Sequence, residues 1–174
     1  VYTPLFSGVF WDVQDTFMDD IERIEVVSGP GATLWGANAV NGVINVVPRS
    51  ALDPSSHGTF VYGGAGTREQ GFGGLRYGAA LSEAAGFRIY AKAGNHDSSR
   101  LANGSAGGDE WNMFQGGFRS DWTPGDGNHL TFQGDLCSGE RDQFAAMDTR
   151  VAGGNLLTRW THDFTDDSSV HAQF

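Results

Sequence analysis

Alternation of apolar and polar residues over long segments is the feature that most limits what this sequence can fold into. Within residues 112–122, for example, Phe114, Phe118 and Trp122 fall on one face and Asp121 on the other. The same alternation occurs in residues 75–81, 86–97, 128–136, 156–164 and 170–174. Because successive side chains of a β-strand point to opposite faces, a period of two predicts a sheet with one apolar face.

The length of these segments favours a membrane-spanning sheet. Strands in soluble proteins average about 5–6 residues, whereas tilted membrane-spanning strands need about 9–11, and most of these segments are at least that long. The connections also alternate, with short turns at residues 82–85, 124–127 and 165–168 and long polar loops at residues 98–109 and 139–153. Phe87, Trp122 and Phe164 lie close to short turns, where outer-membrane barrels carry an aromatic girdle.

The polar face of the same strands carries charged candidates for a site. They are Arg76, Arg88, Lys92, Arg119, Asp121 and Arg159. In a barrel these side chains would face the lumen and meet a plug or a substrate. The alternative is pairing between neighbouring strands inside the wall, and the sequence leaves both interpretations open.

The first part of the chain has a different pattern. Residues 21–27 read as a strand, Gly29, Pro30 and Gly31 form a turn, residues 32–39 are compatible with a short helix ended by Gly42, and residues 43–47 read as a second strand. The following polar stretch, residues 48–56, contains two prolines and predicts a boundary between domains 1–50 and 57–174.

Several kinds of site are not supported. A dinucleotide-binding motif would need glycine at position 34, where Leu34 stands, and no phosphate-loop lysine follows. The net charge of −10 argues against nucleic-acid binding. The single Cys137 rules out an internal disulfide. The five histidines lack ligand spacing, and Asp163, Asp166 and Asp167 lack the spacing of a calcium loop. We therefore expect no catalytic residues, no metal and no cofactor.

Residues 21–47, IERIEVVSGPGATLWGANAVNGVINVV, closely resemble the C-terminal end of the plug domain of TonB-dependent outer-membrane receptors. The shared features are the acidic–basic strand ending in Gly-Pro, the small-residue segment with Trp-Gly, and the closing Gly-Val-Ile-Asn strand. The resemblance implies a mostly β fold: a partial transmembrane antiparallel β-barrel preceded by a small α+β plug segment. Residues 57–174 would then be about the first seven strands of the barrel.

The resemblance also implies a function. Such receptors import large scarce nutrients such as ferric siderophores, cobalamin or other chelates, and receive energy from a TonB-type protein that pulls a segment near their N-terminus. The expected partners are therefore outer-membrane lipid, this energy-coupling protein and a small-molecule or metal-chelate substrate. The expected location is the bacterial outer membrane.

One departure from the family pattern concerns the contact between plug and barrel. Ser28 stands where the family usually has an arginine that takes part in that contact. Glu22, Arg23 and Glu25 are the remaining candidates for it, although they also read as ordinary solvated strand charges. The pulled segment and the first half of a plug are not present, so we expect a fragment that does not transport by itself.

A soluble secreted β-sandwich that acts as a binding module is the alternative, because its strands also alternate. The two hypotheses differ in where the apolar face lies. In the receptor it faces hydrocarbon, whereas in the sandwich it packs against a second sheet. Extraction only with detergent would support the receptor, and a folded monomer without detergent would support the sandwich.

Overall fold

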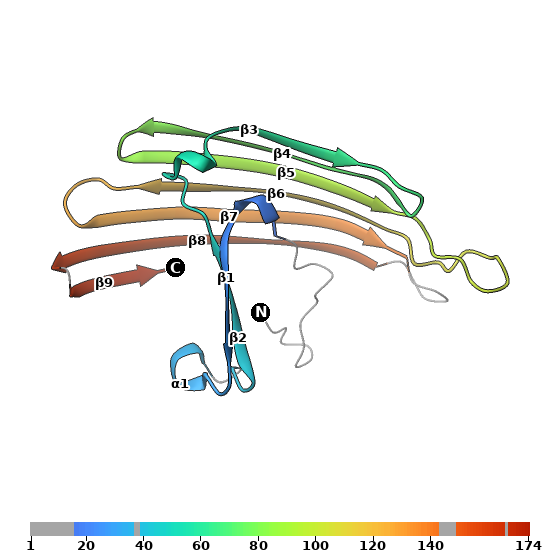
Figure 1. Cartoon of the computed structure of the whole chain (residues 1–174), viewed down its shortest axis with the longest axis horizontal. Coiled ribbons are helices and arrows are strands. Elements are labelled where there is room, and N and C mark those ends of the chain that lie inside the picture. Colours follow the sequence, from blue (N-terminus) through green and yellow to red (C-terminus); the bar gives the residue numbers. More distant parts are fainter. Residues whose placement is uncertain (1–15, 37–38, 143–148, 166) are drawn as a thin grey trace. The chain divides into compact units, whose positions relative to one another are not determined.

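The computed structural model describes residues 16–36, 39–142, 149–165 and 167–174. These residues belong to two compact units, Thr16–Ser50 and the segment Ala51–Phe174. Figure 1 draws both units with their elements labelled. No helix among the described residues is long and apolar enough to cross a membrane.

The first unit is a hairpin with a short helix at its turn. It contains η2 (Met18–Asp20), β1 (Ile21–Ser28), α1 (Ala32–Trp35) and β2 (Gly42–Pro48). Strands β1 and β2 are antiparallel. Gly42 is required where it stands, because it has a φ of +155° and a Cβ there would lie within 3.0 Å of the Val27 carbonyl oxygen.

The prediction of a helix over residues 32–39 was too long. The helix ends at Trp35, because Gly36 has a φ of +91° and leaves the helical conformation. Residues 37–38 lie outside the described part of the chain. The two predicted strands are confirmed, each with one or two further residues paired at its ends.

The second unit is a single antiparallel sheet in which each strand pairs with the next along the chain. Its order is β3-β4-β5-β6-β7-β8-β9. A 3-10 turn, η3 (Pro54–Ser56), precedes β3 (Gly58–Gly64), β4 (Glu69–Ser82), β5 (Ala85–His96), β6 (Trp111–Trp122), β7 (Asn128–Arg141), β8 (Thr149–Thr165) and β9 (Ser168–Gln173). The mostly β fold class is therefore confirmed.

The connections lie at two ends of this sheet, as Figure 1 shows. The turns after β4, β6 and β8 share one end, and the long loop after β5 lies at the other. The prediction of a loop over residues 139–153 was wrong for residues 139–141 and 149–153, since β7 runs to Arg141 and β8 starts at Thr149. Residues 139–141 and 149–150 contain no apolar side chain, so alternation does not reveal these strand ends; residues 143–148 lie outside the described part.

Burial in this sheet is the reverse of that in a soluble protein. The apolar face is exposed, with Leu136 at 70% and Phe118 at 42%, while Arg88 and Asp121 on the polar face are 4% and 5% exposed. Among the described residues of this unit no second sheet covers the apolar face. The arrangement therefore has the polarity of a wall whose outer side meets hydrocarbon and whose inner side meets protein.

Candidate functional site

A short connector, defined here as residues 51–57, lies directly on the polar face of the sheet. Ala51 and Ser56 are both fully buried. A Cβ on Gly86 would come within 3.0 Å of the Ala51 carbonyl oxygen, and a Cβ on Gly78 would come equally close to that of Ser56. The two strand glycines thus form the seat of the connector, because any side chain at either position would displace it.

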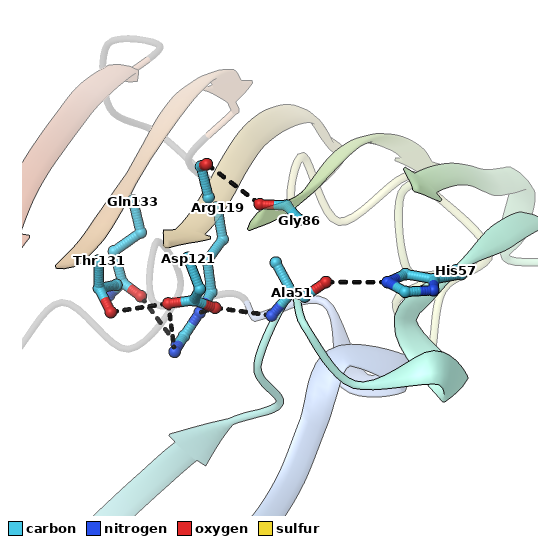
Figure 2. A network of polar contacts seen from close by, with 8 residues as sticks. Ala51, His57, Gly86, Arg119, Asp121, Thr131 and Gln133 are labelled. Atoms are coloured by element: carbon cyan, nitrogen blue, oxygen red, sulfur yellow. Dashed lines mark hydrogen bonds and ion pairs between the residues drawn. The ribbon is translucent and has the colours of Figure 1, made fainter. Parts of the chain in front are cut away.

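The carboxylate of Asp121 holds the start of the connector. It accepts a hydrogen bond from the backbone N–H of Ala51 at 2.6 Å. It also accepts bonds from Arg119 at 2.7 and 3.1 Å and from the Thr131 hydroxyl at 2.7 Å. Arg119 donates in addition to the side-chain oxygen of Gln133 at 3.3 Å, and Figure 2 shows this network. A carboxylate so deeply buried is stable only because charge-assisted bonds of this kind replace its hydration.

Further bonds give the connector its compact shape. The Asp53 carboxylate accepts from the N–H and the hydroxyl of Ser55 at 2.8 and 2.7 Å, which caps the 3-10 turn. The Nε2 of His57 lies 3.0 Å from the Ala51 carbonyl oxygen, as Figure 2 also shows. Because a carbonyl can only accept, Nε2 carries the proton in this contact. From the sheet, Arg76 donates to the Ser55 carbonyl at 3.4 Å.

A second polar cluster lies on the same face, farther from the short turns. The Tyr90 hydroxyl donates to Asp135, and the side-chain amide of Asn155 donates to the other Asp135 oxygen at 3.4 Å. This contact passes over Gly117, where an added Cβ would lie within 3.0 Å of both partners. A third glycine on the polar face is therefore explained by a close side-chain contact.

Strand pairing puts the six charged candidates of the polar face on one side of the sheet. Arg119 and Arg159 bond to neighbouring strands, the former to Gln133 at 3.3 Å and the latter to Gln173 at 2.8 and 3.0 Å. Arg119 also pairs with Asp121 on its own strand. Asp121 differs from them because it also holds the connector. Of the two interpretations, pairing between strands of the wall therefore applies to Arg119 and Arg159. Asp121 instead also contacts another segment, the connector.

The candidate plug residues bond to one another on the hairpin of the first unit. Arg23 forms ion pairs with Glu22 at 2.8 Å and with Glu25 at 2.7 Å. The pKa of Glu25 is lowered, first by a hydrogen bond from the Asn45 side chain at 2.9 Å and then by the bond from Arg23. The same ion pairs raise the pKa of Arg23.

The Gly29-Pro30-Gly31 turn is closed by backbone bonds. The N–H of Gly29 donates to Asn41 at 3.1 Å, and that of Gly31 donates to Ala39 at 2.9 Å. Gly29 has a φ of +105°, a conformation that favours glycine. These amides are used inside the turn, which is consistent with its structural rather than phosphate-binding interpretation.

The loop between β5 and β6 is organised around Asp109. Its carboxylate accepts from the Ser99 N–H at 2.6 Å and from the Ser98 hydroxyl at 3.3 Å. The backbone bond from Ser99 is the main cause of a lowered Asp109 pKa. In the part of the chain that the structure describes, no group of three or more His, Cys, Asp or Glu is placed to hold a metal ion; Asp166 lies outside that part.

Comparisons with known proteins agree with this geometry. Residues 6–43 match the family model of the TonB-dependent receptor plug domain. The chain is 50% identical over 50 residues to the vitamin B12 transporter BtuB of Vibrio vulnificus, a match that covers 29% of the chain. It is 59% identical over 29 residues to an iron-regulated outer membrane virulence protein of Vibrio cholerae, over 17% of the chain.

A solved structure shares the fold over most of the chain. The copper transporter OprC matches 88% of the chain with a TM-score of 0.68 at 21% sequence identity. These alignments span 8% of the length of BtuB, 4% of the Vibrio cholerae protein and 24% of OprC.

These findings define the class of protein as the TonB-dependent receptors of the bacterial outer membrane. The resemblance drawn from residues 21–47 is thereby confirmed, as is the location in the outer membrane. The chain carries a plug segment followed by part of a transmembrane antiparallel barrel wall. The motif in residues 21–47 did not predict the seat of the connector. Glycines on the polar face of the strands, such as Gly78 and Gly86, were the feature of the sequence that could have indicated it.

Proposed function

We propose that the receptor containing this chain imports a large, scarce nutrient across the outer membrane, using energy delivered by a TonB-type protein. The substrate class that we infer is a ferric siderophore, cobalamin or another chelate. The observation that carries the proposal is a plug segment joined, through a connector seated on the polar face, to a wall whose other face is apolar. A plugged lumen excludes free diffusion, so passage needs movement of the plug.

The relatives support the substrate class by their names, which refer to vitamin B12, iron regulation and copper. All three concern metals or metal-containing compounds. The three names refer to different compounds, so we propose only the substrate class of metal chelates and not one substrate. Since the relatives are receptors and transporters, we further propose that the chain has no enzymatic role.

The assignment of residues 1–50 to the plug and 57–174 to the barrel is part of this proposal. The proposal also includes a contact between the barrel wall and three plug residues, Glu22, Arg23 and Glu25. It further includes outer-membrane lipid as a partner. A charge reversal such as Arg23→Glu in the complete receptor tests that contact. If the contact exists, a compensating reversal at a wall carboxylate will restore uptake. If Arg23 pairs only with Glu22 and Glu25, no reversal on the wall will restore it.

Uptake by whole cells tests the function. Cells that express the complete receptor are given radiolabelled cobalamin, a ferric siderophore or a copper chelate. We expect accumulation of one of these that stops when the TonB-type protein is deleted or the proton gradient is collapsed. Accumulation independent of both, or a folded monomer that needs no detergent, would contradict the proposal and favour the soluble sandwich.

A further inference from the structure

We propose that Asp121 is a positioning residue that fixes the connector to the wall, so that residues 51–57 stay on the wall when the plug moves during transport. This inference rests on the proposed function, in which the plug moves. It concerns residues that the family motif in residues 21–47 does not include. The connector is thus part of the wall rather than a flexible link.

The switch between the two units occurs over a single residue. The N–H of Arg49 donates to the Asp20 carbonyl at 2.7 Å, inside the first unit. Two residues later, the N–H of Ala51 donates to Asp121 at 2.6 Å, inside the second unit. The bond at Arg49 therefore belongs to the first unit and the bond at Ala51 to the second, so the chain passes from one unit to the other between these two residues.

The seat beneath the connector is formed by shape as well as by charge. Gly86 and Gly78 leave room for the backbone carbonyls of Ala51 and Ser56, and both of these connector residues are fully buried. Gly86 is not required by its own conformation, since it has no positive φ. Its lack of a side chain is explained by the connector above it.

Fixing the connector limits how far the plug can travel. If residues 51–57 came off the wall, seven residues of extended chain would add about 23 Å of slack before the first barrel strand, at about 3.3 Å per residue. With that extra length, a pull near the N-terminus would move the whole plug without changing its shape. If the chain is held at Ala51, the same pull stretches the plug between its two ends, and a change in the plug's shape is what the proposed passage of substrate needs.

Gly86→Ala tests the inference with little change elsewhere, because it leaves Asp121 and Arg119 in place. Gly94→Ala is the matched control: it lies on the same strand and face, and its added Cβ meets only Phe72 at an ordinary 3.8 Å. Asp121→Ala removes the bond directly, but it also leaves the partly buried Arg119 without its counterion. Folding of each variant is checked by heat-dependent gel mobility of the complete receptor.

Hydrogen exchange of the peptide covering residues 49–57 is measured in the complete receptor in lipid vesicles. We expect Gly86→Ala and Asp121→Ala to raise the exchange rate of the connector amides about tenfold or more, with Gly94→Ala like the wild type. In Gly86→Ala the exchange of β6 and β7 should stay unchanged, because Asp121 keeps its bonds to Arg119 and Thr131. Energy-coupled uptake should fall by a similar factor, while binding of substrate to the cell surface stays the same.

Unchanged connector exchange in folded Gly86→Ala and Asp121→Ala would overturn the inference. So would normal uptake in a variant whose connector exchange has risen. Failure of the proposed function gives a different result, namely no energy-coupled uptake by the wild-type receptor, and the exchange measurement does not depend on it.

Discussion

Phe118→Arg tests the orientation of the sheet in the membrane. Phe118 lies on the exposed apolar face of β6, midway between Phe114 and Trp122, and is itself 42% exposed. The eight steps from Phe114 to Trp122 span about 26 Å along the strand at about 3.3 Å per residue. With a tilt of about 40° this corresponds to about 20 Å of membrane depth, with Phe118 near its middle.

An arginine at that depth loses its hydration, and only local thinning or bending of the side chain toward the surface relieves the loss. For barrel proteins the cost is about 2–4 kcal/mol at the midplane and about 0–1 kcal/mol near the interface. The folding equilibrium constant should therefore fall about 30- to 1,000-fold. Asn112→Arg is the matched control, because Asn112 is on the same strand and face but beyond the apolar residues.

The assay is denaturant-induced unfolding of the complete receptor in lipid vesicles, followed by tryptophan fluorescence and gel mobility. We expect a clear loss of unfolding free energy for Phe118→Arg and a loss of less than about 1 kcal/mol for Asn112→Arg. Equal losses for the two variants would refute the reasoning, since they would show that depth along this face has no effect.

Two further predictions concern groups outside the barrel strands. The Ser99 N–H lowers the pKa of Asp109 in the folded loop. The ionised carboxylate therefore stabilises the loop fully above the pKa of the unfolded chain, and this stabilisation is lost as pH falls through the lowered folded value. Hydrogen exchange of the loop should rise in acid, and Asp109→Asn should remove this pH dependence. Asn45→Ala should move the pKa of Glu25 upward toward its ordinary value, measured by NMR titration of a labelled Glu25 carboxyl, and an unchanged pKa would show that Asn45 is not its main hydrogen-bond partner.

The faces of the sheet were predictable from the sequence because alternation reports them directly. Phe114, Phe118 and Trp122 are exposed together, and Asp121 lies buried on the other face. The pattern lost its information at the strand ends 139–141 and 149–150, which contain no apolar residue. It also passed over β3, where Phe60, Val61 and Tyr62 are apolar on both faces, and the start of β4, where glycines replace the side chains that would show a period.

The connector seat was beyond sequence reasoning for a different reason. Asp121 and Ala51 are 70 residues apart, and no local pattern pairs a backbone N–H with a distant carboxylate. Gly86 was visible as a small residue on a polar face, but its purpose depends on which segment lies above it. Such contacts arise from topology, because the register of several strands must be known before the two positions can be brought together.

Spin labels placed one at a time along residues 113–121 of the complete receptor test the central claim most directly. In outer-membrane lipid, collision with oxygen, which concentrates in hydrocarbon, should peak at positions 114, 116, 118 and 120 and fall at the positions between them. Collision with a water-soluble nickel complex should stay low at positions 115 and 121, because the polar side chains there are buried. Oxygen collisions in the opposite phase, or without a period of two, would contradict a wall that turns its apolar face to lipid.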